Sequence, residues 1–170
     1  RFVICVVVSA ALAGTNLLTK EKIAEQQALK AEESRRIVLD SADSFEAQDN
    51  GEYYAGIKDG QTVGYVFETE SKGYGGTVRV MTGISSEGEI TGVVVLSHSE
   101  TPGLGANAEK EDFRNQYKQA APESGIEIVK YQTPAEGQIE AMTGATITTK
   151  AVTQAVNQAV EKFYTVKGGA

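Results

Sequence analysis

The sequence is organised around residues 142–149, which read Met-Thr-Gly-Ala-Thr-Ile-Thr-Thr and stand directly before a segment of periodic apolar residues. We expect a helix to begin here, because the oxygen of Thr143 or Thr146 can accept a hydrogen bond from the first turn and Gly144 lets the backbone bend. The surplus of small and hydroxylated side chains leaves two interpretations open. The stretch is either a simple helix cap or a phosphate site at the positive end of the helix dipole, where a threonine hydroxyl could itself be esterified.

The segments on either side of this stretch predict an α+β fold. Apolar residues recur at spacings of three and four from Val152 to Phe163, which predicts a helix with one apolar stripe packed on a sheet. The Asp59-Gly60 pair predicts a hairpin turn between two strands. Expected strands are Tyr53–Ile57, Thr62–Thr69, Gly76–Thr82, Ile90–Ser97 and Ile126–Tyr131, with a further helix over Glu109–Lys118. The sum is a mainly antiparallel sheet packed with helices.

Two glycine-rich connections are candidate ligand contacts. Residues 71–76, Ser-Lys-Gly-Tyr-Gly-Gly, end at Gly76 and either allow a flat ligand to approach closely or form an ordinary hairpin link. Residues 97–107 place Leu104 between two glycines after Thr-Pro, so Leu104 either covers a ligand or merely marks a strand-to-helix connection. His98 has no second histidine or cysteine with which to form a metal-ligand pair, so we interpret it as a structural or surface residue.

Composition limits the possible functions. The 170 residues are 41% hydrophobic and 23% charged, enough for one domain with a proper core. A net charge of −7 argues against a nucleic-acid partner, which would require clustered lysine and arginine. The single cysteine, Cys5, excludes an intrachain disulfide, and the sequence shows neither paired carboxylates nor a Ser-His-Asp set. We therefore expect no metal site and no catalytic residue.

The N-terminal part predicts attachment to a membrane. Residues 2–18 carry no charge and would span roughly 25 Å as a helix, so we interpret residues 1–19 as a transmembrane anchor. A cleavable signal peptide and a buried core helix are the alternatives. Residues 20–50 alternate in charge and are interpreted as a helical stalk and linker. A count of lysine and arginine would place the remaining domain in the cytoplasm, although long domains cross membranes largely regardless of charge.

Taken together, Thr-Gly-Ala-Thr at residues 143–146 and Glu-Thr-Pro-Gly-Leu-Gly at residues 100–105 resemble the FMN-binding domain of membrane redox complexes. The likeness extends over nearly the whole chain and is greatest to the family formed by the G subunits of Rnf complexes. The C subunits of the sodium-pumping NADH:quinone oxidoreductase form a related family. The sequence departs from the family in carrying Glu140 where an aspartate is usual.

The resemblance implies a specific set of cofactor contacts. The last threonine of the motif, Thr146, would carry FMN as a phosphoester, made by a separate flavin transferase with FAD as the donor. Thr143, Gly144 and Ala145 would shape the phosphate pocket. The full set of expected cofactor-binding residues is Thr146, Thr143, Gly144, Ala145, Ile147, Thr148, Glu100, Thr101, Leu104, Gly105 and Gly76.

The resemblance also implies a function, which we state as an expectation. The chain would be an electron-transfer subunit of an ion-translocating ferredoxin:NAD oxidoreductase of the Rnf type, in contact with other subunits of that complex. Residues 51–170 would form an FMN-binding domain on the extracytoplasmic side of the inner membrane, held by the single anchor, against the charge count. The alternatives are a component like the C subunit of a sodium-pumping quinone reductase, a non-redox membrane-anchored assembly subunit, and a reversible FMN-binding reductase.

Overall fold

The computed structural model describes residue 26 and residues 28–168. The expected anchor over residues 1–19 therefore lies outside the described residues. In the part of the chain that is described, no helix is long and apolar enough to cross a membrane. The chain divides into two compact units, residues 1–33 and 34–170, and the second unit contains every strand described below.

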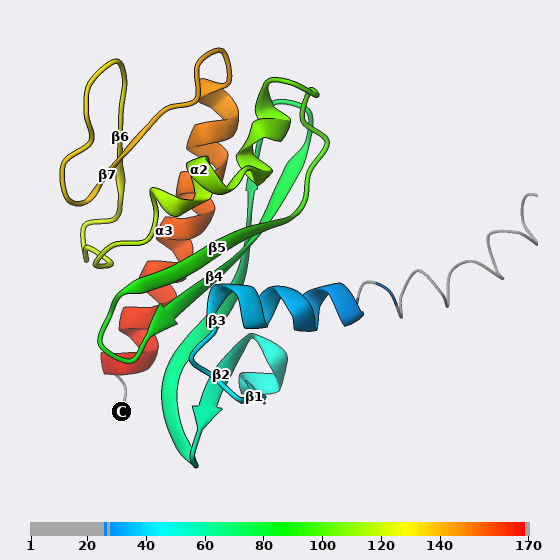
Figure 1. Ribbon diagram of the computed structural model, residues 1–170, viewed down its shortest axis with the longest axis vertical. Coiled ribbons are helices and arrows are strands. Elements are labelled where there is room, and N and C mark those ends of the chain that lie inside the picture. The colour runs from blue at the N-terminus through cyan, green and yellow to red at the C-terminus, as the bar shows by residue number, and fades with distance from the viewer. Residues whose placement is uncertain (1–25, 27, 169–170) are drawn as a thin grey trace, which may run out of the picture. The chain divides into compact units, whose positions relative to one another are not determined.

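The second unit is built on a five-stranded antiparallel sheet in which each strand pairs with the next along the chain (Figure 1). Its strands are β1 (Ser44–Gln48), β2 (Tyr53–Lys58), β3 (Gln61–Lys72), β4 (Thr77–Ser85) and β5 (Ile90–Ser97). The turn expected at Asp59-Gly60 joins β2 to β3, and both residues have positive φ angles of 51° and 77°. Such angles match the right-handed twist of the flanking strands, which is why Asp-Gly is a strong hairpin signal. The predicted antiparallel sheet with helices is confirmed.

Strand β1 was not foreseen, because its residues fall in the segment 20–50 that we interpreted as stalk and linker. In the described part of that segment, residues 28–38 are helical, and a short 3₁₀ helix, η1 (Asp49–Gly51), follows β1. Since β1 is an edge strand of five residues with largely exposed side chains, its alternation consists of only two apolar residues, Phe45 and Ala47, which is a weak signal. The compact unit begins at Ser34, whereas we set the start of the domain at 51. The division into anchor, stalk and extracytoplasmic domain stays a prediction.

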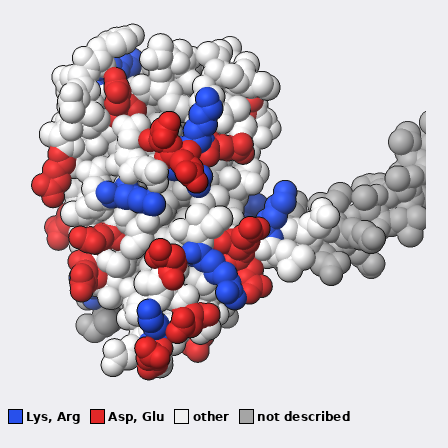
Figure 2. All heavy atoms as spheres, viewed as in Figure 1, with Lys and Arg blue, Asp and Glu red and all other residues white. Residues whose placement is uncertain are grey.

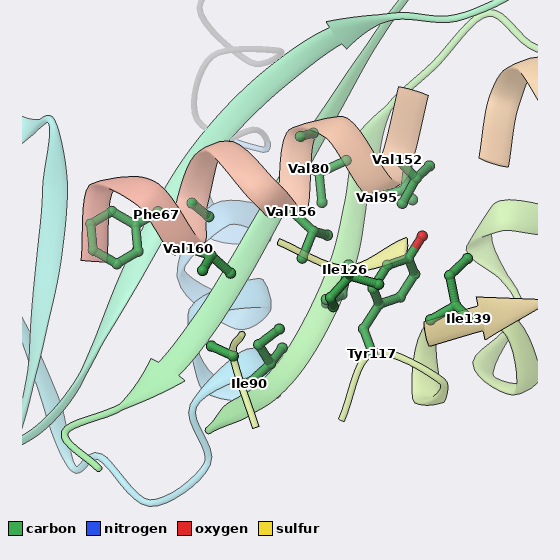
Figure 3. Packing of buried hydrophobic residues seen from close by; sticks show 14 of the residues in the cluster. Phe67, Val80, Ile90, Val95, Tyr117, Ile126, Ile139, Val152, Val156 and Val160 are labelled. Carbon is green, nitrogen blue, oxygen red and sulfur yellow. The ribbon is translucent and has the colours of Figure 1, made fainter. Parts of the chain in front are cut away.

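Helix α3 (Thr146–Gly168) lies across one face of the sheet and forms the main core with β3 and β4. Figure 3 shows valines 152, 156 and 160 of the helix beside Phe67 and Val80 of the strands, and all of these side chains are buried. The hydroxyl of Thr69 on β3 also donates to the carbonyl of Ala155, over 2.7 Å. The predicted apolar stripe and its packing on the sheet are thus confirmed.

The opposite face of the sheet is covered by Val38, the last residue of the first helix, and by Leu39, which follows it. They lie on a strip of four glycines that the strand register pairs as Gly56 with Gly64 and Gly83 with Gly92. A Cβ atom at any of the four positions would come within 3.0 Å of Val38 or Leu39. Because these positions carry no side chain, Val38 and Leu39 can pack directly against the backbone of the sheet.

The connection from β5 to α3 is mostly irregular and covers the edge of the core. It contains η2 (Gly105–Glu109), α2 (Glu111–Asn115), β6 (Glu127–Val129) and β7 (Gln138–Glu140), with β6 and β7 parallel. Both elements expected here are shorter than predicted. The helix that we expected to reach Lys118 ends because Tyr117 and Lys118 bond to carbonyls only three residues back, which tightens the turn. Tyr117 is nevertheless fully buried, close to Ile126 and Ile139 (Figure 3).

Candidate functional site

The stretch 142–149 forms a turn that becomes the first turn of α3. Gly144 has a φ of +77°, a conformation that glycine adopts without strain. The N–H of Ala145 donates to the carbonyl of Met142 (3.1 Å), and the first helical bond joins the N–H of Thr149 to the carbonyl of Ala145 (2.9 Å). The N–H groups of residues 146–148 consequently have no acceptor within the helix. The positive end of a long helix thus begins at Thr146.

Thr149 holds this turn in place. Its buried hydroxyl accepts from the N–H of Met142 (3.1 Å) and donates to the carbonyl of Ala145 (3.0 Å). The expectation that Thr143 or Thr146 caps the helix was wrong, because neither side chain forms a hydrogen bond within the described part of the chain. Thr149, inside the first turn, bonds back to the residues before the helix and not to the first-turn N–H groups, so these stay uncapped and the hydroxyl of Thr146 has no partner in the described part of the chain.

A hollow of about 630 Å³ opens beside this helix start, between the beginning of α3 and the loop that precedes η2. That volume is in the range of pockets that hold small molecules and cofactors. Nine of the eleven residues that we expected to contact the cofactor line it. They are Glu100, Thr101, Leu104, Gly105, Gly144, Ala145, Thr146, Ile147 and Thr148. The structure therefore brings together two motifs that are some forty positions apart in the sequence.

Two expected residues lie outside this hollow. Thr143 lines a much smaller neighbouring hollow, together with Glu140, Gly144 and Thr146. Gly76 lies beside Ser99, where an added Cβ would be 3.5 Å from the Ser99 side chain. Thr146 lines both hollows and is half-buried, so it marks the boundary between them.

Glu100 forms the floor of the hollow and is only 6% exposed. One carboxylate oxygen accepts the hydroxyl of Thr148, and the other accepts the N–H of Gly75 over 2.8 Å. The N–H of Glu100 donates to Nδ1 of His98 (3.1 Å), and Nε2 of that imidazole lies 3.2 Å from Glu109. Glu100 thus connects three segments, namely the glycine-rich link, the Thr-Pro-Gly-Leu-Gly loop and α3.

The surroundings of Glu100 keep its carboxyl group ionised. Burial, the largest single effect, raises the pKa of Glu100. The hydrogen bonds from Thr148 and from the backbone of the 73–76 link, together with the nearby His98, outweigh burial and lower the pKa below its ordinary value. The Glu100 carboxylate is therefore a fixed, already bonded anion at the start of α3 and acts in holding the loops together.

Gly105 allows the loop before η2 to lie directly on this cluster. A Cβ atom at Gly105 would come within 2.5 Å of the Thr148 hydroxyl and 2.8 Å of the Glu100 carboxylate. Leu104, the residue before it, reaches the other motif, since its Cδ2 would lie 3.3 Å from a Cβ on Gly144. The two motifs are thus in contact on either side of the hollow.

Two residues that line the hollow were not among those expected, Tyr74 and Tyr131. Tyr74 stands in the glycine-rich link that we had singled out for a flat ligand, but we named only Gly76 there. Tyr131 lies in the irregular connection after β6, where no periodicity identifies a site residue. For Tyr74 the available signal was an aromatic residue among glycines, whereas Tyr131 stood at the end of the strand that we expected over Ile126–Tyr131 and gave no such signal.

The hollow fits a flat aromatic ligand with a phosphate group. Glu100 is the only ionisable carboxyl among its lining residues, and that group is already bonded. The rim carries apolar and aromatic side chains, and the unpartnered hydroxyl of Thr146 stands at the helix start, where a phosphate is favoured. A larger hollow of about 1070 Å³ lies along the C-terminal half of α3. It contains none of the expected residues, and most of the residues that line it are polar or charged.

Charge on the visible surface gives no indication of a polyanionic partner. Acidic and basic side chains are interspersed over the face shown in Figure 2, which carries no broad basic patch.

Comparison with known proteins places the chain in a family. Residues 73–161 match the model of the FMN-binding domain. The G subunit of the proton-translocating ferredoxin:NAD(+) oxidoreductase complex of Clostridium ljungdahlii is 37% identical over 97% of this chain and 89% of its own. The G subunit of the Na(+)-translocating complex of Acetobacterium woodii is 36% identical over 95% of this chain and 87% of its own.

Solved structures share the fold. The C subunit of the Na(+)-translocating NADH-quinone reductase from Parabacteroides distasonis is 25% identical, with a TM-score of 0.54 over 66% of this chain and 60% of its own. NqrC of Shewanella oneidensis is 22% identical, with a TM-score of 0.59 over 66% of this chain and 57% of its own. The chain thus spans less than two thirds of these solved chains. The second likeness concerns the fold alone.

The fold and the site define an FMN-binding domain of the type found in membrane redox complexes. Within that class, the chain belongs to the family formed by the G subunits of ion-translocating ferredoxin:NAD(+) oxidoreductase complexes, as the resemblance of the two motifs predicted.

Proposed function

We propose that this chain is an electron-transfer subunit of an ion-translocating ferredoxin:NAD oxidoreductase, and that it carries FMN bound covalently through a phosphoester to Thr146. The observation that supports this most directly is the position of that threonine. Its hydroxyl is half-buried and without a protein partner, and it stands at the start of a 23-residue helix and on the wall of an apolar-rimmed hollow.

The hydrogen bonds of the other threonines favour Thr146 as the attachment point. Thr148 donates its hydroxyl to Glu100, and Thr149 donates its hydroxyl to Ala145. Both side chains are buried, so neither is available for modification without breaking the turn. Thr143 is exposed and unbonded but lies outside the larger hollow. Thr146 alone of the four combines a free hydroxyl with access to the space that would hold the ring system.

The attachment reaction needs a donor and an enzyme, and we propose FAD and a flavin transferase. The Thr146 hydroxyl oxygen would form a bond to the phosphorus of the FMN half of FAD while the pyrophosphate bond breaks. AMP would leave, and the hydroxyl proton would pass to a base of the transferase or to water. Glu140 lines the small hollow with Thr143 and Thr146 and is exposed, so it is accessible to such an enzyme.

The bound flavin would supply the redox chemistry, since flavins exchange electrons singly or in pairs. The protein would position the cofactor. The N–H groups of residues 146–148 would face the phosphate, Leu104 and Ile147 would exclude water from the ring, and Glu100 would keep the two loops at a fixed separation. A covalent bond would also prevent loss of the cofactor on the extracytoplasmic side, where we place residues 51–170, held by an anchor over residues 1–19.

Intact-mass spectrometry of the full chain tests the attachment. Protein from cells that contain the transferase should exceed the sequence mass by FMN less one water, and the band should fluoresce on a denaturing gel. Thr146→Ala should abolish both signals, whereas the matched control Thr143→Ala should retain them. Retention of the added mass in Thr146→Ala would move the attachment to another residue. An unmodified chain in the presence of the transferase would instead support the assembly-subunit alternative.

A further inference from the structure

Large exposed hydrophobic side chains gather around the hollow at Thr146. The described residues include six large hydrophobic side chains that are exposed, and four of these line this one hollow. They are Tyr74, Leu104, Tyr131 and Ile147, with exposed fractions of 73%, 47%, 89% and 52%. Exposed apolar side chains that gather at one place mark a binding surface. Two of the four are aromatic, and they come from loops more than fifty residues apart.

Tyr131 is held in an unfavourable backbone conformation. Its φ angle is +56°, a region that costs a bulky side chain free energy and that short polar residues or glycine normally occupy. No core packing explains this cost, because the side chain is almost fully exposed. Strained residues persist where the surrounding structure requires a particular side-chain position, and they gather at ligand sites. Tyr131 also lines the small hollow beside Thr143 and Thr146, so it stands next to the proposed attachment point.

The backbone of Tyr74 is held by hydrogen bonds, whereas its side chain is exposed. It is followed by Gly75, whose N–H donates to the buried carboxylate of Glu100, and its own backbone also bonds to that carboxylate. The same carboxylate binds Thr148 in the first turn of α3. The position of the Tyr74 backbone is thereby tied to the start of α3, while its ring remains exposed in the hollow.

We propose that Tyr74 and Tyr131 are positioning residues that stack on the isoalloxazine ring of the flavin and fix its orientation, an inference that rests on the proposed function. Aromatic rings attract one another in stacked or edge-to-face arrangements beyond the effect of area alone. Two such rings at one hollow favour a flat aromatic ligand over a flexible aliphatic one. Thr146 would tether the phosphate, and the tyrosines would hold the other end of the cofactor.

The test uses the full chain loaded with flavin, with loading verified by intact mass. Tyrosine stacking quenches flavin fluorescence, and a fixed orientation gives the flavin band a circular dichroism signal. Unfolding the unsubstituted protein should therefore raise its flavin fluorescence several-fold. Tyr74→Leu and Tyr131→Leu should each raise the emission of the folded protein several-fold and weaken the dichroism. Tyr131→Phe, which keeps a ring, should retain the dichroism.

The matched control is Tyr54→Leu, which removes a tyrosine outside the hollow, one whose ring lies 3.8 Å from the Arg35 guanidinium. Its emission and dichroism should equal those of the unsubstituted protein. Should the leucine variants at 74 and 131 be loaded and behave like this control, the stacking proposal is overturned while the attachment to Thr146 stands.

A second measurement needs no substitution and covers the case in which a variant is not loaded. The full chain with isotope-labelled tyrosine is made with and without the transferase, and the ring signals are compared by NMR. The signals of Tyr74 and Tyr131 should shift on loading through the ring current of the flavin, while that of Tyr54 should not. Unshifted signals in loaded protein would overturn the stacking proposal. Absence of the added mass would refute the proposed function itself, which is a different result.

Discussion

The Glu100 carboxylate is the residue whose protonation should matter most to the stability of the site. Its folded-state pKa is lowered, so its contribution is fully present above the unfolded value of about 4.3 and is lost as the pH falls through the folded value. Replacement by glutamine places an amide donor against Gly75 N–H or the Thr148 hydroxyl, and an unsatisfied buried donor costs about 1–3 kcal/mol.

We therefore predict that Glu100→Gln lowers the free energy of unfolding by about 1–3 kcal/mol at pH 7, and that the difference from the unsubstituted protein narrows below pH 4. Urea unfolding at both pH values measures this. Glu140→Gln, at an exposed glutamate, is the matched control and should change little. A difference that stays constant or grows on acidification would contradict the prediction.

Replacement of Tyr131 by glycine tests whether its left-handed backbone conformation costs free energy. Tyr131→Gly should leave the free energy of unfolding of the flavin-free protein unchanged or raise it by up to about 1 kcal/mol. Relief of the left-handed conformation contributes roughly 1–2 kcal/mol, and the added flexibility of unfolded glycine subtracts roughly 0.5–1 kcal/mol. Tyr131→Leu keeps the strain and should show no gain. A loss of more than about 1 kcal/mol in the glycine variant would mean that the tyrosine side chain stabilises the fold, and thermal or urea unfolding decides this.

At the scale of single residues, sequence and structure agree where a motif carries the information. Thr146, Leu104 and Glu100 were named from two motifs, and the structure places all three on one hollow. Tyr131 was not named, because its positive φ angle and its place on the hollow arise only in the folded chain and neither is visible in local sequence. The expectation that Thr143 or Thr146 caps the helix was wrong for a related reason, because the turn is held by Thr149 instead. Thr149 reaches back seven residues to Met142, a contact that only the folded turn creates.

Among the elements, α3 is the one to which the irregular connection is fastened. The side-chain amide of Asn157 accepts from the N–H of Ile126 (2.7 Å) and donates to the carbonyl of Ile126 (3.0 Å). Ile126 is buried, so these backbone groups have little access to water. The hydroxyl of Tyr164 donates to the carbonyl of Ala121 over 2.6 Å. These bonds hold residues 117–142, which supply Tyr131 to the hollow, against the helix that supplies Thr146.

We predict that Asn157→Ala lowers the free energy of unfolding by about 2–4 kcal/mol, because it leaves one buried donor and one buried acceptor unpaired. Hydrogen exchange at the Ile126 amide should accelerate more than exchange in β3 and β4. Gln158→Ala, one position along the helix, is the control and should cost much less. Equal acceleration throughout the sheet would show that the connection is not anchored independently by this side chain.

Element prediction succeeded where periodicity was strong and failed where the pattern was polar or short. The apolar stripe from Val152 to Phe163 identified α3, and the Asp59-Gly60 turn identified the β2–β3 hairpin, since both signals are local in sequence. Strand β1 consists of Ser-Phe-Glu-Ala-Gln at an exposed edge, so its alternation rests on Phe45 and Ala47 alone, and the pairing with β2 is what defines it as a strand. The helix at 111–115 is short because the N–H groups of Tyr117 and Lys118, just after it, donate to carbonyls three residues back and not four. This tightening accompanies the burial of Tyr117, which local sequence does not reveal.

For the whole molecule, the α+β class followed from the order of strands and helices, but the extent of the folded unit did not. The four glycines under Val38 and Leu39 have no role that the sequence alone reveals. Their function depends on cross-strand pairing, in which Gly56 faces Gly64 and Gly83 faces Gly92. Only the register aligns them into one strip. As a result, a segment that we assigned to a linker covers one face of the sheet. Its Val38 and Leu39 form a buried cluster there with Val66 of β3 and Met81 of β4.

This arrangement predicts which truncations fold. A chain that begins at Ser34 keeps β1 and the cover over the glycine strip and should unfold cooperatively in urea. A chain that begins at 51 lacks β1, Val38 and Leu39, so it exposes the edge of β2 and one apolar face. Burial of the two side chains is worth about 1.5–3 kcal/mol each, so the shorter chain should be less stable by at least about 3 kcal/mol or should aggregate through its open edge. Substitution of Val38 and Leu39 by alanine in the longer chain separates the loss of cover from the loss of β1. Equal urea midpoints for the two truncated chains would mean that the domain starts where the sequence pattern changes, at 51, and that the preceding segment only lies on the sheet without stabilising it.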